Sequence, residues 1–392
     1  MHTGRTVFSQ LMDFVPRHEF RVFVERHGAS RCLKRFSCWD QFLCMAFAQL
    51  TYREGLRDIE TCLRSLGPTL YHSGIRGRVS RSTLADANER RSWEVYHDLA
   101  MNLIARARRL YHDERIISEI EGAVYALDST IIELCLKLFP WARAANHLKT
   151  SAGVKLHTLL ELGSDLPVFA RVSEANVNDI RLLQQLSFEP GAFYVLDRGY
   201  TSFAELRRID TSGAFFVIRA KRRLRFRRLY SNTQSKTDTV RVDQTIVLEV
   251  PKSHEGYPDQ LRRVKVFDTV NNRMLVFLTN NFDLEASTIG ELYRRRWNIE
   301  LFFRWIKQHL RIKSFYGTSF NAVSTQIWIA LCIFVLVAIV KKELKLPHSL
   351  YTILQILSIT LFEKAPINQV LTTHTVPLEP PKIEKQLILF DF

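Results

Sequence analysis

AVYALD, residues 123–128, decides the fold, because five apolar side chains in a row lead directly into an aspartate. Similar short, largely apolar runs follow it. They are VKLHTLLEL at 154–162, PVFARV at 167–172, AFYVLD at 192–197 and AFFVIRA at 214–220. Runs of this length, separated by turn residues such as Gly163-Ser164-Asp165, are typical of buried β-strands. We therefore expect a sheet between residues 123 and 220.

Two helical segments interrupt these predicted strands. NDIRLLQQL at 178–186 and TSFAELRRI at 201–209 have apolar residues at helical spacing and begin at residues that cap helices. The predicted order is therefore β-β-β-α-β-α-β, which resembles the core of the ribonuclease-H-like fold, a mixed sheet flanked by helices. We expect an α/β protein with this catalytic core over 116–220 and 285–345.

The region before the sheet, residues 1–115, is predicted to be an all-helical domain. Apolar residues recur at helical spacing from Trp39 to Leu66, before Gly67-Pro68, and again from Ser82 to Tyr111. Basic residues are frequent on the second stretch and just before it. This pattern fits a small DNA-binding domain, and it fits equally well a set of helices with an ordinary solvated face.

Residues 221–284 are predicted to form a β-rich insertion. KRRLRFRRLY at 221–230 has six Lys or Arg among its first eight residues, and the segments after it alternate like antiparallel strands. A long helix is predicted from Glu285 to Leu310. Residues 346–392 are expected to hold one more helical segment and a proline-punctuated tail.

Composition and charge narrow the class of partner. The chain has 55 Lys and Arg against 40 Asp and Glu, a net charge of +15. A chain this basic usually binds a polyanion, most often nucleic acid, although a solubilising charge or an anionic membrane remains an alternative. The apolar run Ile327–Val340 has 14 residues. A bilayer core needs roughly 20, so we expect a buried helix of a cytoplasmic protein and no membrane association.

Two aspartates, Asp128 and Asp197, directly follow apolar strands. A single aspartate in such a place is most often a cap or a turn residue. Two of them at the ends of neighbouring strands predict a site beyond the edge of the sheet, because a carboxylate is costly to bury there without a partner.

The segment ELYRRRWNIELFFRWIKQHL, residues 291–310, supplies further polar groups. On a helical wheel Tyr293, Arg296, Glu300 and Lys307 fall within about 60° of one another, along the border of the apolar face. Such a stripe is also the ordinary charged flank of an amphipathic helix. Together with the two aspartates, however, it adds a third carboxylate.

Three carboxylates suit the cleavage of phosphodiesters. The reaction needs an activated water and a stabilised leaving oxygen. Two Mg²⁺ ions roughly 4 Å apart provide both, and Mn²⁺ can take the place of Mg²⁺. Carboxylates are the usual protein ligands of such ions. We therefore predict that Asp128, Asp197 and Glu300 are catalytic metal ligands. We expect Tyr293, Arg296 and Lys307 to face the DNA phosphates.

The chain resembles a known family through these same residues. The spacing Y-x2-R-x3-E-x6-K, together with DST at 128–130, DRGY at 197–200 and FPWARAANHLKTSAGVKLHTLLEL at 139–162, is similar to bacterial insertion-sequence transposases with a DDE active site, the IS-four-type branch. The resemblance spans about 115–345. It implies a ribonuclease-H-like catalytic domain with a β-strand insertion, Mg²⁺ dependence, an N-terminal domain that binds the terminal inverted repeats, and a dimeric synapse of two DNA ends.

The predicted function is therefore cut-and-paste transposition, with metal-dependent cleavage and strand transfer of double-stranded element ends into target DNA. The protein is expected in a bacterial cytoplasm, on the nucleoid when bound. Alternatives are a ribonuclease-H-like endonuclease of repair or recombination, and an inactive transposase-derived DNA-binding protein. Beyond the helical stripe, the predicted DNA contacts are Arg198, Tyr200, Arg222, Arg223, Arg225 and Arg227.

Four other residues have roles that the sequence leaves more open. Lys155 and His157 lie on one face of a predicted strand and could line the DNA side of the site or be half-buried structural residues. Asp179 is expected to cap a helix or lie at the surface. Trp297 is expected to pack.

Overall fold

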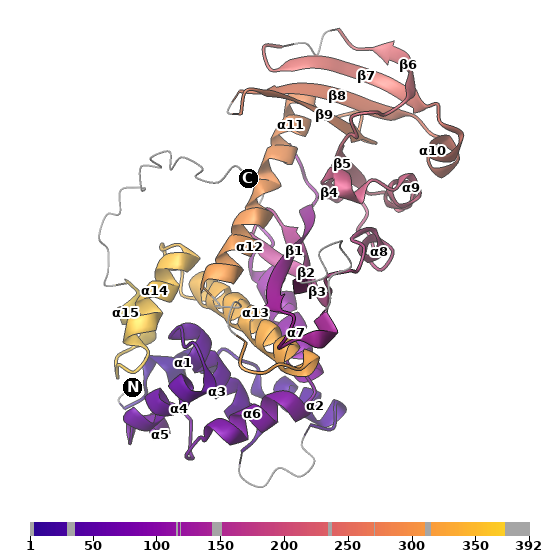
Figure 1. Cartoon of the computed structure of the whole chain (residues 1–392). Coiled ribbons are helices and arrows are strands. Elements are labelled where there is room, and N and C mark those ends of the chain that lie inside the picture. The colour runs from indigo at the N-terminus through magenta and orange to yellow at the C-terminus, as the bar shows by residue number, and fades with distance from the viewer. Residues whose placement is uncertain are drawn as a thin grey trace.

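Nine strands form one mixed sheet that extends through most of the molecule (Figure 1). The computed structural model describes residues 4–29, 36–114, 117, 119–142, 151–233, 237–269, 271–309 and 315–372. Within these residues the strand order is β3-β2-β1-β4-β5-β9-β8-β7-β6. The strands are β1 (Val124–Cys135), β2 (Ser151–Glu161), β3 (Leu166–Glu174), β4 (Phe193–Leu196), β5 (Phe215–Arg219), β6 (Phe226–Ser231), β7 (Val240–Leu248), β8 (Leu261–Asp268) and β9 (Arg273–Thr279).

The centre of the sheet combines parallel and antiparallel pairs. β1 pairs in parallel with β4, and β4 in parallel with β5, whereas β2 pairs antiparallel with both β1 and β3. α8 (Ile180–Leu183) precedes β4, and α9 (Phe203–Thr211) lies between β4 and β5. The predicted order β-β-β-α-β-α-β is therefore confirmed.

The insertion continues this sheet. β9 pairs antiparallel with β5, and β8, β7 and β6 follow as an antiparallel meander. α10 (Pro251–Gly256) connects β7 to β8. The predicted β-rich character of residues 221–284 is confirmed, and β6 becomes an edge strand at the end of the molecule far from the N-terminal helices (Figure 1).

Helices make up the region before the sheet, as predicted. They are α1 (Val7–Met12), α2 (Arg17–Arg26), α3 (Cys38–Leu50), α4 (Leu56–Ser65), α5 (Thr69–His72), α6 (Arg81–Arg90) and α7 (Glu94–Leu110). Those after the insertion are α11 (Ala286–Arg295), α12 (Trp297–His309), α13 (Phe320–Glu343), α14 (Leu350–Thr360) and α15 (Ile367–Thr372). One apolar core joins the N-terminal helices to the sheet through α13, so the division into domains stays a prediction.

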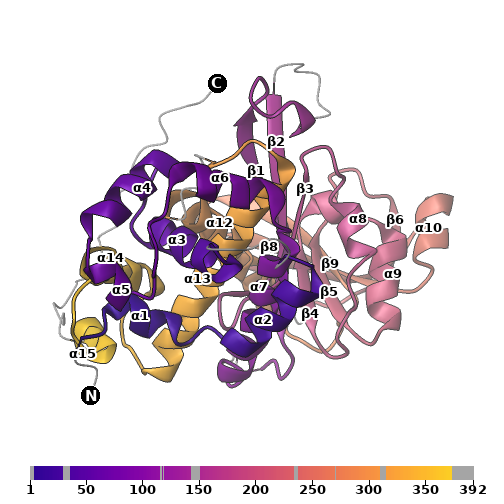
Figure 2. The ribbon, with the colours of Figure 1, turned by 90° about the horizontal axis from the view of Figure 1, so that it is seen from below.

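Side chains of β1 and β4 alternate between two apolar layers, as the period of two in a strand requires. One set packs on the side of α7, α12 and α13 and comprises Val124, Ala126, Phe193 and Val195. The other set packs on the side of α8 and α9 and comprises Tyr125, Leu127, Tyr194 and Leu196. The sheet thus lies between α8–α10 on one side and α12, α13 and the N-terminal helices on the other (Figure 2).

α13 is the central helix of the larger layer. Its residues from Ala322 to Val340 are all buried, which confirms the predicted buried helix at 327–340. Ser319 caps it through a bond from the Ala322 N–H, so the helix is longer than the apolar run. By length and composition alone its 24 residues could cross a membrane, but its apolar window lies entirely inside the protein. The predicted proline-punctuated tail, 376–386, lies outside the described residues.

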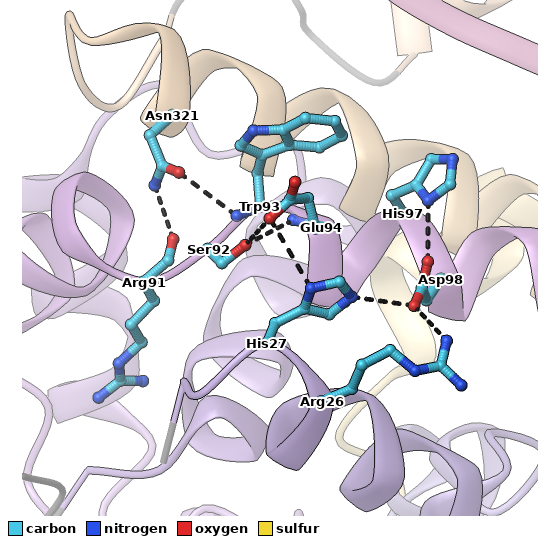
Figure 3. A network of polar contacts seen from close by, with 9 residues as sticks. All are labelled: Arg26, His27, Arg91, Ser92, Trp93, Glu94, His97, Asp98 and Asn321. Atoms are coloured by element: carbon cyan, nitrogen blue, oxygen red, sulfur yellow. Dashed lines mark hydrogen bonds and ion pairs between the residues drawn. The ribbon is translucent and has the colours of Figure 1, made fainter. Parts of the chain in front are cut away.

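A polar network attaches the N-terminal helices to one another and to α13 (Figure 3). Asp98 of α7 accepts a hydrogen bond from Nη1 of Arg26 at 2.8 Å and contacts Nε2 of His27 at 2.9 Å. The side-chain amide of Asn321, in the first turn of α13, donates to the carbonyl oxygen of Arg91 at 2.6 Å. These contacts fix α2 and the start of α7 beside the helix that supports the sheet.

Candidate active site

Asp128 and Asp197 lie on adjacent strands, but only Asp197 is at the end of its strand; Asp128 lies inside β1, which continues to Cys135, so its predicted position at a strand end was wrong. β1 and β4 are parallel, and the last paired residues are Leu127 and Leu196, each followed directly by its aspartate. Because side chains alternate along a strand, Asp128 shares the face of Ala126, which packs toward α12 and α13. The predicted proximity of the two strands is confirmed.

The helix predicted from Glu285 to Leu310 is divided at Arg296 into α11 and α12. Around this residue the hydrogen bonds span three residues instead of four: Arg296 N–H donates to the Tyr293 carbonyl at 3.2 Å, and Ile299 N–H donates to that of Arg296 at 3.1 Å. Such bonds tighten a helix locally. The prediction of one continuous helix was therefore wrong at this point, although the polar stripe persists across the break.

Two residues of that stripe connect the three carboxylates. Nη1 of Arg296 lies 2.9 Å from Oδ2 of Asp128, and Nη2 of the same guanidinium bonds Oε1 of Glu300. The Tyr293 hydroxyl donates to Oδ1 of Asp197 at 3.0 Å. The structure thus brings Asp128, Asp197 and Glu300 near one another where the pairing of β1 with β4 ends, with Arg296 and Tyr293 directed at carboxylates.

The site concentrates negative charge. Burial raises the pKa of Asp128; the Ser129 N–H and Arg296 oppose this shift, and the charges of Glu300 and Asp197 add to it. Burial alone would lower the pKa of Arg296, but its pKa is raised by Tyr293 and by the two carboxylates that it contacts. The charges of Glu300 and Asp197 thus disfavour the ionised form of Asp128, which makes this a place where positive charge is stabilised.

Tyr293 is suited to hold Asp197 in place. Its side chain is buried, and burial together with the charge of Asp197 raises the pKa of the phenol to about 12. The hydroxyl therefore stays protonated at neutral pH and can donate its hydrogen bond to the carboxylate.

The donor set fits a hard divalent cation, because its ligand atoms are carboxylate oxygens in a region of accumulated negative charge. Among the residues that the structure describes, no three Asp, Glu, His or Cys side chains are already arranged around a single metal position. Here the guanidinium of Arg296 supplies the positive charge between Asp128 and Glu300.

The other residues of the predicted motifs lie in different surroundings. Lys307 is half-buried on α12, and Arg198 is half-buried in the 3₁₀ turn that follows Asp197. That turn directs Tyr200 into the apolar cluster beside α9, where its side chain is 3% exposed. A side chain so buried packs in the core, so the expectation of a DNA contact for Tyr200 does not fit this structure.

The four predicted DNA-contacting arginines of the insertion are all exposed. Three precede β6 and one lies in it, at the edge of the sheet. They are Arg222, Arg223, Arg225 and Arg227.

The lesser predictions had mixed outcomes. Lys155 and His157 are buried, on the face of β2 that packs toward α8, so they do not line the carboxylate side of the sheet. Trp297 is 50% exposed, and the expectation that it packs was wrong. Asp179 precedes α8, but its carboxylate accepts a hydrogen bond from Ser129 instead of capping the helix. The hydrogen bond between Ser129 and Asp179 was not predicted from the sequence.

Comparison with protein families identifies two regions of the chain. Residues 120–336 match the family described as the transposase DDE domain, and residues 3–76 match a domain of unknown function. The first match covers Asp128, Asp197 and the helix that carries Glu300.

Individual relatives agree with this match. A Sinorhizobium fredii protein described as transposase y4zB is 32% identical over 292 residues, which are 72% of this chain and 78% of the relative. A Geobacillus stearothermophilus protein described as the transposase of insertion sequence element IS5377 is 28% identical over 62% of this chain and 63% of its own length. The piggyBac transposase in its synaptic complex with hairpin DNA is a distant structural neighbour, with a TM-score of 0.46 and 10% identity over 96% of this chain and 81% of the neighbour.

Proposed function

The chain belongs to the DDE transposases, enzymes that cleave DNA and transfer its strands, and we propose that Asp128, Asp197 and Glu300 are its catalytic carboxylates. The observation that carries this proposal is their convergence through Arg296 and Tyr293 where the pairing of β1 with β4 ends. DDE transposases use divalent metal ions. The accumulated negative charge around Asp128 supports binding of such ions at these residues.

The core is proposed to be ribonuclease-H-like, over 116–220 and 285–345. Support comes from the antiparallel strands β1–β3 beside the parallel strands β4 and β5, with an aspartate on β1 and one after β4, each directly after the last residue that pairs these two strands. Residues 221–284 would be its insertion, residues 1–115 the domain that binds the terminal inverted repeats, and residues 346–392 a C-terminal segment.

The proposed mechanism assigns each residue a separate task. Two Mg²⁺ ions, or Mn²⁺ in their place, would be held by Asp128, Asp197 and Glu300 and would supply an activated water and a stabilised leaving oxygen. Tyr293 fixes the orientation of Asp197 because its hydroxyl donates a hydrogen bond to the carboxylate. Before the ions bind, Arg296 balances the charge of Asp128 and Glu300; once they displace it, its planar fork matches the oxygens of a phosphate.

The proposed substrate is double-stranded DNA: the element's ends, joined by a homodimer in the synaptic complex, and the target. The net charge of +15 and the exposed arginines of the insertion support phosphate contacts. Lys307 and Arg198 are further proposed contacts. The place of action would be the bacterial cytoplasm, on the nucleoid.

A cleavage assay tests the carboxylates. DNA carrying the element's end is cut over a Mg²⁺ titration by Asp128→Asn, Asp197→Asn and Glu300→Gln, with gel shifts and thermal melts in parallel. Each variant is expected to lose roughly a thousandfold or more in cleavage while end binding persists, because the metal site supplies most of the catalysis. Glu291→Gln is the matched control, since Glu291 pairs with Arg295 on the exposed side of α11. Wild-type cleavage by a folded Glu300→Gln would exclude the assignment, and absence of metal-dependent cleavage in the wild type would favour an inactive DNA-binding derivative.

A further inference from the structure

A second polar cluster lies on the opposite face of the sheet from the carboxylates. Its members come from β1, β2 and the segment before α8. Nζ of Lys155 is 3.3 Å and Nδ1 of His157 is 3.4 Å from Oδ1 of Asp179. The hydroxyl of Ser129 donates to the same oxygen at 2.8 Å. Four polar side chains therefore meet in the smaller layer of the protein.

Ser129 connects this cluster to the active site. Its side chain faces α8, because it follows Asp128 in a strand and successive side chains point to opposite faces. Its backbone N–H donates to Oδ1 of Asp128 at 2.8 Å. One residue thus bonds a carboxylate on each face of the sheet: Asp128 through the backbone and Asp179 through the side chain.

Helix capping does not explain the position of Asp179. The N-terminus of α8 is capped by Asn178, whose Oδ1 accepts a hydrogen bond from the Ile180 N–H at 3.0 Å. The side chain of Asp179 makes no capping bond. Its carboxylate is directed toward the strands instead.

The cluster would be unfavourable without internal pairing. Lys155 and His157 are 8% and 1% exposed, and charges so deeply placed are stable only when they are paired. Burial lowers the pKa of His157 to about 4, so its imidazole is neutral at neutral pH. Lys155, which also donates to the Val177 carbonyl at 2.8 Å, is then the counter-ion of Asp179. Asp179 can therefore accept the hydrogen bond from Ser129 without leaving an uncompensated charge on this face of the sheet.

We propose that Asp179 is a positioning residue for Asp128 and that it acts through Ser129, with Lys155 as its counter-ion. The inference rests on the proposed role of Asp128 as a metal ligand. A ligating carboxylate depends on the outer partners that fix its orientation, and loss of such a partner typically costs 10- to 100-fold in metal affinity or activity. Ser129, anchored to Asp179, would keep this part of β1 and the Asp128 carboxylate turned toward α12.

Binding of Mn²⁺ to the full chain without DNA tests this directly, with free Mn²⁺ counted by its electron paramagnetic resonance signal. Ser129→Ala removes the hydroxyl and is expected to weaken Mn²⁺ binding about tenfold. Ser129→Thr keeps a hydroxyl at a half-buried position and should bind within about twofold of wild type. Asp128→Asn is the reference for a missing ligand and should remove most of the binding.

Asp179 is tested with its own controls. Asp179→Ala should weaken Mn²⁺ binding about as much as Ser129→Ala. Because it leaves Lys155 buried without its counter-ion, a double variant with Lys155→Met serves if the single variant does not fold. Asn178→Ala removes the cap of α8 and leaves Asp179 in place, so it should bind Mn²⁺ like wild type.

The outcomes separate the two proposals. If Ser129→Ala and the Asp179 variants bind Mn²⁺ like wild type while Asp128→Asn does not, the positioning role is overturned and the proposed function stands. If Asn178→Ala weakens binding as much as Asp179→Ala, the effect belongs to the packing of α8, and the positioning role is again overturned. If Asp128→Asn itself binds like wild type, the metal-ligand assignment falls and the inference falls with it.

Discussion

Arginine side chains occupy opposite environments at the carboxylate site and at the edge of the sheet. Arg296 is 12% exposed in its side chain and lies between Asp128 and Glu300. The arginines of residues 222–227 are exposed, beside or within an edge strand. The same side chain is thus fixed by partners in one region and open to solvent in the other.

The difference separates structural charge from charge available to a ligand. A buried guanidinium is tolerated only with its partners, so its removal leaves carboxylates uncompensated. An exposed one contributes little to stability, and it can meet phosphate or simply prevent another strand from pairing with the edge. The three changes below test this division, from the largest expected loss of stability to the smallest.

The insertion contains a buried arginine of its own, which should behave like the one at the site. Arg262 forms a bidentate pair with Asp243, with both N–O distances at 2.9 Å and side chains 7% and 4% exposed. Arg262→Met is expected to lower the free energy of unfolding by about 3–5 kcal/mol, because it removes the charged partner of a buried carboxylate. Urea melts measure it. The double variant Arg262→Met/Asp243→Leu should recover most of the lost stability. A loss below about 1 kcal/mol in the single variant would mean that this pair contributes no more to stability than a surface ion pair does.

Arg296→Ala should make stability depend on metal. Without the guanidinium, the charge of Glu300 disfavours ionised Asp128, and we expect the free energy of unfolding to fall by about 2 kcal/mol in EDTA, less than for a fully buried pair because both carboxylates are partly exposed. Mg²⁺ should restore more stability to the variant than it adds to wild type, as thermal melts with and without the ion would show. Arg295→Ala, on the exposed side of α11, is the control. If Mg²⁺ raised the melting temperature of the variant and of the wild type equally, the cation would not occupy the position of the Arg296 guanidinium.

The smallest effect on stability is expected at the edge strand. Replacing Arg222, Arg223, Arg225 and Arg227 together by alanine should change stability by no more than about 1 kcal/mol. DNA binding should respond strongly, with the slope of log K against log salt flattened by about 0.9 for each DNA phosphate that an arginine no longer neutralises. Gel shifts over a salt series measure the slope. An unchanged slope would mean that these four arginines do not contact DNA phosphates and only prevent another strand from pairing with the edge strand β6.

Local sequence patterns were sufficient to predict the order of the strands, but not that β1 continues past Asp128 to Cys135. Buried strands leave short apolar runs, and the aspartates directly follow two of them, so their placement needed only the order of elements. The pairing of β5 with β9 was not predicted, because it joins residues separated by the whole insertion. No local pattern encodes such a pairing.

The network of Asp179 depends on register in the same way. Ser129 faces His157 across β1 and β2, and a shift of one residue would place His157 opposite Asp128 on the other face. Residue type misled the interpretation of Trp297. The wheel places it about 40° from Tyr293, away from the apolar side chains of the helix, so the spacing contained the signal for its exposure.

Anomalous diffraction from crystals grown with Mn²⁺ and a DNA duplex that ends in the element's terminal repeat tests the central claim most directly. The predicted result is Mn²⁺ within about 2–2.5 Å of carboxylate oxygens of Asp128, Asp197 and Glu300, the range of metal–oxygen bonds of hard cations. Arg296 would then have left its position between Asp128 and Glu300. Bound Mn²⁺ at other side chains, with these three carboxylates unliganded beside the DNA, would contradict the claim.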